Sequence, residues 1–187
     1  MRFKIIKEFF KIDLKYKESI YTYKQIDGFL AITLFIVTMI VYYLTGIIYA
    51  EKTLYFGIQS NLFLVLLCVA CVLARKQKMS SIGFGKENIG KSLIFGVVTA
   101  SIILLAKFIP GIIEGNQFSP VVYLSSKFVY FLIAIALVEE ILFRGFIQTR
   151  IYGVLKNSLI AILTTSFMFM LLHIPFQMGK VHMGFIS

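Results

Sequence analysis

The sequence predicts an all-α fold: a polytopic transmembrane helical bundle of about five spans, preceded by an amphipathic N-terminal helix. The first observation is composition, because 59% of the 187 residues are hydrophobic and the mean hydropathy is +0.87. A soluble domain of this size has too little interior to bury so much apolar surface. The second observation is that the apolar residues gather in runs approaching the ~20 residues needed to cross a bilayer. Because backbone groups cannot stay unpaired in lipid, these runs must be helices.

The N-terminal segment, residues 1–27, is predicted to be a basic amphipathic helix on the cytosolic leaflet. Its apolar residues recur at helical spacing beside a stripe of lysines, which suits anionic lipid. A solvated basic tail is the alternative. The net charge of +10 also raises nucleic acid as a partner, but the lysines and arginines lie between apolar runs. We therefore expect membrane lipid as a partner and no nucleic acid.

A transmembrane domain is predicted over residues 28–187. The hydropathy of its fourth run falls at residue 143, but an apolar stripe continues through Phe146 and Ile151, so this helix is extended to residue 152. The predicted spans are 28–50, 54–74, 92–113, 120–152 and 158–176.

Lysine and arginine counts between the spans predict the orientation. The segments in chain order carry seven, one, five, none and three of these residues. Because cytosolic loops carry the excess of positive charge, the alternation places the N-terminus, 75–91 and 144–157 in the cytosol. The chain is therefore predicted to be a multi-pass protein of the cell membrane with a cytosolic N-terminus.

A charged cluster interrupts the fourth span. Glu139 and Glu140 are adjacent carboxylates, and Arg144 follows the second by four residues, so that Glu140 and Arg144 share one helix face and can pair. A carboxylate in hydrocarbon costs on the order of 2.5–3.5 kcal/mol, and two together also repel each other. Such a pair is rarely kept for packing alone, which indicates a functional site.

A histidine in the next span is predicted to meet this cluster. A turn centred near residue 155 or 156 puts Glu140 about 15 residues before it and His173 about 17 after. Antiparallel helices then place the two at nearly the same depth, and Phe169, one turn from His173, can wall the shared pocket. Carboxylates with a histidine can bind a divalent metal or take a proton from a held water. Ion or proton transport needs the same residue types, so a hydrolase and a transporter both stand at this point.

Two motifs carry a resemblance to a known family. Glu139-Glu140-x-x-x-Arg144 resembles the E-E-x-x-x-R motif of the CPBP intramembrane proteases, which include the CAAX prenyl endopeptidases and the bacterial Abi or bacteriocin-processing proteins. Phe169-x-x-x-His173 resembles the second motif of that family, F-x-x-x-H, on the following helix. The order, spacing and helical context of the two motifs agree over residues 120–176.

The resemblance implies an intramembrane metalloendopeptidase that hydrolyses peptide bonds of a membrane-associated substrate, either a prenylated peptide or a bacteriocin leader. A motif glutamate and His173 would activate a water, with or without a divalent metal such as zinc, and Arg144 would orient the carboxylates. The metal ligands would be His173 and Glu140. Phe143 and Phe169 are expected to line the pocket.

The third motif of the family, a histidine often followed by an asparagine four residues later, is not matched. His182 is the only later histidine, and we expect it in a loop or tail. This departure leads us to expect a fragment, a shortened gene product or a degenerate member of the family. It supports an alternative function, a non-catalytic immunity or accessory protein of the same family. Transport is disfavoured because the sequence has no repeated halves and no pair of broken helices.

Overall fold

The structure, a computed structural model, describes residues 18, 20–84, 89–115 and 121–182; of the predicted N-terminal amphipathic helix over 1–27, residues 1–17 and 19 lie outside them. This part of the chain is helical and holds no strand, which confirms the predicted all-α fold. The long helices are α3 (Gln25–Lys52), α4 (Gly57–Ala74), α5 (Ile89–Ile113) and α9 (Ser158–His182), and a short 3₁₀ turn, η1 (Met79–Ile82), follows α4. His182, expected in a loop or tail, is the last residue of α9.

The remaining helical stretch runs without a break through the charged cluster. It begins at Val121 and ends at Leu155, where Lys156 takes a left-handed conformation (φ 55°). Two parts of it are π-helical, with the wider i→i+5 bonding that often marks functional sites. Its parts are α6 (Val121–Tyr130), η2 (Phe131–Ala136), α7 (Leu137–Glu139), η3 (Glu140–Ile147) and α8 (Gln148–Leu155).

Four of the described helices, α3, α4, α5 and α9, are long and apolar enough to cross a membrane. Their outward faces carry large hydrophobic side chains, which lipid accepts and water does not. The protein is therefore a multi-pass membrane protein. The other predicted span, 120–152, corresponds to the interrupted helix α6–α8.

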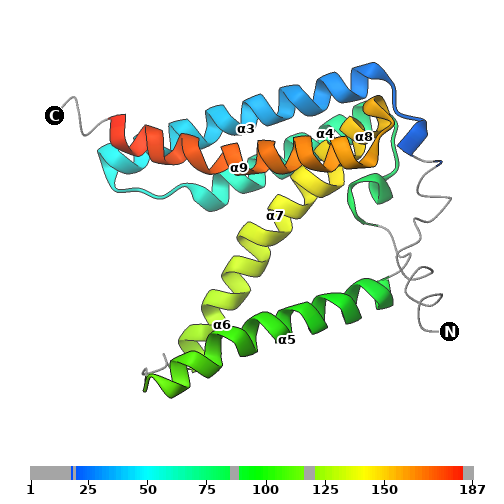
Figure 1. Cartoon of the computed structure of the whole chain (residues 1–187). Helices are drawn as coiled ribbons and strands as arrows, with labels where there is room; N and C mark the ends of the chain where they lie inside the picture. The colour runs from blue at the N-terminus through cyan, green and yellow to red at the C-terminus, as the bar shows by residue number, and fades with distance from the viewer. Residues whose placement is uncertain (1–17, 19, 85–88, 116–120, 183–187) are drawn as a thin grey trace, which may run out of the picture.

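Helices α3 and α9 lie side by side and run in the same direction (Figure 1), and glycines let them come close. A Cβ atom at Gly46 of α3 would overlap the carbonyl oxygen of Phe176, and one at Gly179 of α9 would overlap that of Tyr43. Small residues at such a crossing allow backbone-to-backbone packing, the usual way in which membrane helices associate. This contact fixes α9 firmly relative to α3.

Helix α5 is set apart from the other long helices, and α6 leads from beside its far end back to them (Figure 1). None of the α5 side chains is buried. The buried core is instead built from α3, α4, α9 and the second half of the interrupted helix.

A buried polar network closes one end of the bundle, and it corrects one sequence-based interpretation. Arg150 belongs to the segment 144–157, which the sequence predicts to be cytosolic and therefore solvent-exposed, yet it is 0% exposed. Its Nη1 donates to the carbonyl oxygens of Ser81 (3.2 Å) and Gly145 (3.0 Å), and its Nη2 donates to Gln77 Oε1 (2.6 Å). Gln77 in turn donates to Asp27 at 2.8 Å. The arginine therefore ties the segment after α4 to α8 and α3 instead of meeting solvent.

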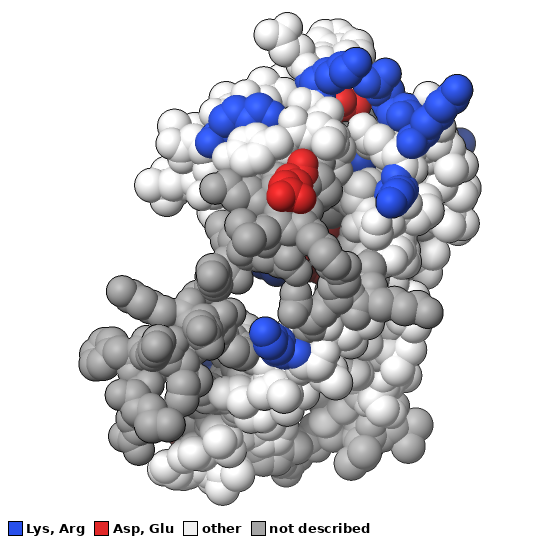
Figure 2. Space-filling model, turned by 90° about the vertical axis from the view of Figure 1, so that its right-hand side faces the viewer, with Lys and Arg blue, Asp and Glu red and all other residues white. Residues whose placement is uncertain are grey.

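Basic side chains gather around the same end of the molecule (Figure 2). Arg75, after α4, pairs with Asp27 of α3 at 2.9 Å, and Lys156, after α8, donates to the carbonyl oxygen of Tyr21 at 3.2 Å. The beginning of α3, the end of α4 and the end of α8 thus lie together. These are the segments whose positive charge predicts that they share the cytosolic side.

Candidate functional site

The two adjacent glutamates face different surroundings. Glu139 is half-buried and lines a cavity together with His173. Glu140 instead pairs with Arg144, as their spacing predicts, through Oε1 and Nη1 at 3.0 Å. Both partners of that pair are open, with side chains 52% and 75% exposed. Consecutive residues of a helix differ by about 100° in direction, and of the two carboxylates only that of Glu139 lines the cavity that contains His173.

This placement changes one expectation from the sequence. Glu140 was expected to share its pocket and depth with His173, but the carboxylate in the His173 cavity is that of Glu139. Glu140 and Arg144 line a separate hollow of about 420 Å³ against residues 80–84. Glu139 also borders a third hollow of about 150 Å³, which Glu140 and Arg144 share. Of these three motif residues, Glu139 is the one that borders the His173 cavity as well as the third hollow.

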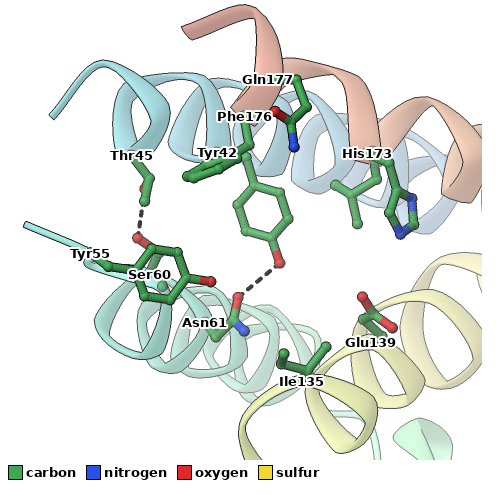
Figure 3. A pocket seen from close by; sticks show the side chains of 12 residues that line it. Tyr42, Thr45, Tyr55, Ser60, Asn61, Ile135, Glu139, His173, Phe176 and Gln177 are labelled. Atoms are coloured by element: carbon green, nitrogen blue, oxygen red, sulfur yellow. Dashed lines mark hydrogen bonds between the residues drawn. The ribbon is translucent and has the colours of Figure 1, made fainter. Parts of the chain in front are cut away.

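The cavity that holds Glu139 and His173 has a volume of about 190 Å³ and is formed by four helical segments (Figure 3). Glu139 and His173 point toward one another across its inner part. The other lining side chains are uncharged, and several are aromatic or neutral polar groups. The lining residues are Tyr42, Thr45, Tyr55, Gly57, Ser60, Asn61, Ile135, Glu139, Leu172, His173, Phe176 and Gln177.

The hydrogen bond made by the His173 ring assigns the roles of its two nitrogens. Nδ1 lies 3.0 Å from the carbonyl oxygen of Phe169, one turn earlier on α9. A carbonyl oxygen only accepts, so Nδ1 must carry the hydrogen, and Nε2 is left to act toward the cavity. Such a bond to the backbone fixes both the tautomer and the ring orientation.

A row of aromatic rings backs the imidazole. The His173 ring meets Phe169 edge to face with centroids 5.1 Å apart, and Phe169 meets Phe143 in the same way, also at 5.1 Å. Phe143 is buried and contacts Phe35 of α3 with centroids 6.3 Å apart. Edge-to-face pairs of this kind are favourable and resist reorientation. Phe143 and Phe169, expected to line the pocket, line the hollow that Glu139 shares with Glu140 and Arg144, and they support His173 from behind.

The described residues do not make a metal site. No group of three or more histidine, cysteine, aspartate or glutamate side chains in the described ranges could hold a metal ion. Catalytic zinc sites use three protein ligands, whereas the cavity joins only Glu139 and His173. Glu140, the other expected ligand, faces away with Arg144. The donor set of the described residues does not fit the expected divalent metal.

Sequence reasoning missed two polar residues of the cavity, Tyr42 on α3 and Asn61 on α4. The Tyr42 hydroxyl donates to Asn61 Oδ1 at 2.8 Å, and Asn61 Nδ2 donates to the carbonyl oxygen of Ala134 at 2.6 Å. A second pair, Thr45 and Ser60, joins α3 and α4 further along the cavity at 2.8 Å. The available signal was an asparagine inside a predicted membrane span, where an amide is expensive unless it has partners.

Comparison with known proteins supports the two motifs. Residues 121–187 match the family described as type II CAAX prenyl endopeptidase Rce1-like. The matched segment contains both Glu139-Glu140-x-x-x-Arg144 and Phe169-x-x-x-His173, so the resemblance predicted from these motifs is confirmed. No curated protein and no solved structure matches the chain.

Proposed function

We propose that this chain, a relative of the type II CAAX prenyl endopeptidases, is an intramembrane endopeptidase in which Glu139 and His173 activate the attacking water. One observation carries the proposal: the two side chains come from antiparallel helices and point toward one another across a single cavity. A carboxylate and an imidazole in that relation can hold a water and take its proton. The family match over residues 121–187 supports hydrolysis of a peptide bond in place of ion transport.

The geometry divides the chemistry between the two residues. His173 donates from Nδ1 to Phe169, so its Nε2 accepts a hydrogen bond from the water. The Glu139 carboxylate takes a proton as the water oxygen bonds to the scissile carbonyl carbon. The proton held by Glu139 then passes to the peptide nitrogen as the C–N bond breaks. The water supplies every atom added to the products, and no other reactant is needed.

Glu140 and Arg144 act differently in this proposal. Two neighbouring carboxylates repel each other, and the repulsion grows as the dielectric constant falls. The Arg144 guanidinium, 3.0 Å from Glu140, neutralises that second charge and holds it on the far side of the helix. Glu139 is then the one carboxylate that lines the His173 cavity.

The cavity lining favours a substrate segment without charged side chains. Apart from Glu139 and His173, its walls combine rings such as Tyr55 and Phe176 with amide and hydroxyl groups. A charged side chain would lose hydration there without gaining a partner. Prenylated peptides and bacteriocin leaders remain the two substrate classes that we propose, each presented from the membrane.

Substitution of the two glutamates tests the proposal, because they are adjacent in sequence but have different surroundings. Glu139→Gln and His173→Ala should each reduce peptide processing by about 10²–10⁴-fold in a purified assay, the usual contribution of a general base. Glu140→Gln should reduce it at least about tenfold less, because its partner is Arg144 and not the water. Melting temperatures in detergent control for misfolding. Full processing by both Glu139→Gln and His173→Ala would overturn the proposal.

The same preparation tests the alternative roles. A wild-type chain that binds candidate peptides but cleaves none would favour the non-catalytic immunity or accessory protein. Metal analysis of the purified chain separates the two ways of activating water. We expect less than one bound divalent metal per chain, and a stoichiometric metal that His173→Ala removes would restore the metal-dependent route.

A further inference from the structure

Tyr42 and Asn61 form a hydrogen-bonded link across the cavity that neither motif contains. It begins on α3 at the Tyr42 hydroxyl, passes through the Asn61 side chain of α4, and ends on the carbonyl oxygen of Ala134 in η2 (Figure 3). Ala134 lies about one π turn before Glu139 on the same helix. The link therefore reaches the backbone that carries the proposed base.

Burial of the Asn61 amide lowers the stability of the fold unless its polar atoms form hydrogen bonds. Asn61 is only 9% exposed on a helix that is apolar from Leu62 to its end, and both of its polar atoms have partners, Oδ1 with Tyr42 and Nδ2 with Ala134. An unbonded amide in an apolar interior would be strongly unfavourable. The bonds thus hold Asn61 in one orientation, and they hold the Ala134 turn against α4.

The carbonyl that Asn61 binds is in an irregular part of the helix. Residues 131–136 form the π segment η2, and wide π turns depart from the regular α ladder. A side-chain donor in such a turn steadies a segment that could otherwise relax toward a regular α-helix. Any such relaxation would rotate Glu139 relative to α9, because one residue of register changes its direction by about 100°.

The other end of the link leads to the helix of His173. Tyr42 is one turn from Gly46, the position where α3 meets the backbone of α9 at Phe176. Phe176 is three residues after His173 on α9. Helix α3 is thus joined to His173 through glycine packing and to Glu139 through Tyr42 and Asn61.

We propose that Tyr42 and Asn61 are positioning residues that set the Glu139 carboxylate opposite His173. The inference rests on the proposed function, since it concerns the geometry of the same cavity. Neither residue is assigned contact with the reacting atoms. Their hydrogen bonds decide where the base stands, and a misplacement of about 1 Å can cost about 10²-fold in rate.

Kinetic comparison of matched variants tests this role. Asn61→Leu keeps the side-chain size but removes both bonds, and we expect kcat to fall about 10–10²-fold while KM stays within about threefold. Tyr42→Phe removes only the bond that orients Asn61, so its kcat should lie between the wild type and Asn61→Leu. Leu64→Ala is the control, because Leu64 is fully buried one turn further along α4 and does not line the cavity. It should lower the melting temperature yet keep kcat.

The values of kcat and of the melting temperature distinguish a positioning role of Asn61 from a role in stability alone. If Asn61→Leu keeps the wild-type kcat, or if Leu64→Ala loses as much kcat at a similar melting temperature, the positioning role is wrong. A second assay needs no activity: cysteines replacing Glu139 and His173 are joined by a short bifunctional reagent. The yield should fall when Asn61→Leu is added and stay unchanged with Leu64→Ala. An inactive wild type would sink the proposed function, whereas an unchanged crosslink yield would sink the positioning role alone.

Discussion

Arg150 and Glu139 are two charged residues of one interrupted helix, eleven positions apart in the sequence, and they differ in burial and in hydrogen bonding. Arg150 is sealed from solvent, and its guanidinium donates to Gln77, Ser81, Gly145 and Thr149. It also lies over the Phe146 ring, with Cζ 4.0 Å from the ring centroid. Glu139 stays half-buried and faces a cavity. A charge whose two terminal nitrogens both have hydrogen-bond partners, as in Arg150, supports structure, whereas a charge kept at a cavity wall remains available for chemistry.

The difference teaches that charge in a membrane helix is not by itself a functional signal. Intramembrane ionisable residues are costly, and two outcomes relieve that cost. Neighbouring segments can supply bonding groups, as the residues after α4 do for Arg150. Alternatively, the group can face a cavity that water or a ligand can enter, as Glu139 does. Substitutions at the two places should therefore affect different quantities, stability at one and rate at the other.

The largest effect should come from breaking the network at Arg150. Arg150→Met removes the donor to Gln77 Oε1 and to two carbonyl oxygens, leaving buried acceptors without partners. We expect the free energy of unfolding to fall by about 3–5 kcal/mol, as when one partner of a buried charged network is removed. Thermal unfolding in detergent measures this. A melting temperature equal to that of the wild type would contradict the structural role of Arg150.

A smaller loss should follow from crowding the same network at Gly145. A Cβ atom there would lie 2.6 Å from the carbonyl oxygen of Ile82, in the segment that Arg150 holds. Gly145→Ala should therefore cost about 1–3 kcal/mol of stability, the usual penalty for overpacking. Gly96→Ala on α5 is the matched control, because its Cβ atom would meet nothing within 4 Å. If both variants unfold at the same temperature, the contact between Gly145 and the segment after α4 is not tight.

Arg144 should behave unlike Arg150 although both are arginines of the same helix. Its side chain is 75% exposed, and its ion pair with Glu140 is accessible to solvent. Exposed ion pairs contribute about 0–1 kcal/mol, so Arg144→Met should change the unfolding free energy by no more than that. Its effect should appear instead as slower peptide processing at unchanged melting temperature. A stability loss as large as that of Arg150→Met would erase the distinction between the two regions.

Topology labelling sharpens the comparison without changing stability. We propose that the Arg150 end of the bundle is cytosolic, so cysteines replacing Lys78 and Lys156 should react with an impermeant reagent only from inside. A cysteine replacing Lys52, at the opposite end of α3, should react from outside. Labelling of residue 78 from outside would show that the orientation is the reverse of the predicted one, with the Arg150 end of the bundle outside the cell.

The helices and the motif pair could be predicted because they depend on local pattern. Long apolar runs must be helical in lipid, and the described helices begin and end within a few residues of most of the predicted run ends. The i,i+4 pairing of Glu140 with Arg144 also follows from helix geometry alone. The meeting of a motif glutamate with His173 could be predicted because only one short turn joins the two helices.

Other features depended on neighbours from distant parts of the chain. Which carboxylate faces His173 is a matter of helix rotation, and π turns in η2 and η3 alter the register that sets it. The burial of Arg150 arises from residues 77–81, about 70 positions earlier in the chain. Asn61 gained its role from Tyr42 and Ala134, on two other helices.

The sequence by itself determined that this protein crosses the membrane as helices and that one pair of neighbouring helices carries glutamates, an arginine and a histidine. Hydrophobicity and periodicity are properties of the local sequence, and they determine which segments enter lipid as helices. These features can therefore be predicted without knowledge of tertiary contacts. Only the tertiary structure decided that Glu139 meets His173 while Arg150 is sealed inside the bundle. A side chain's surroundings depend on the rotation and spacing of packed helices, and those are set by contacts between residues far apart in sequence.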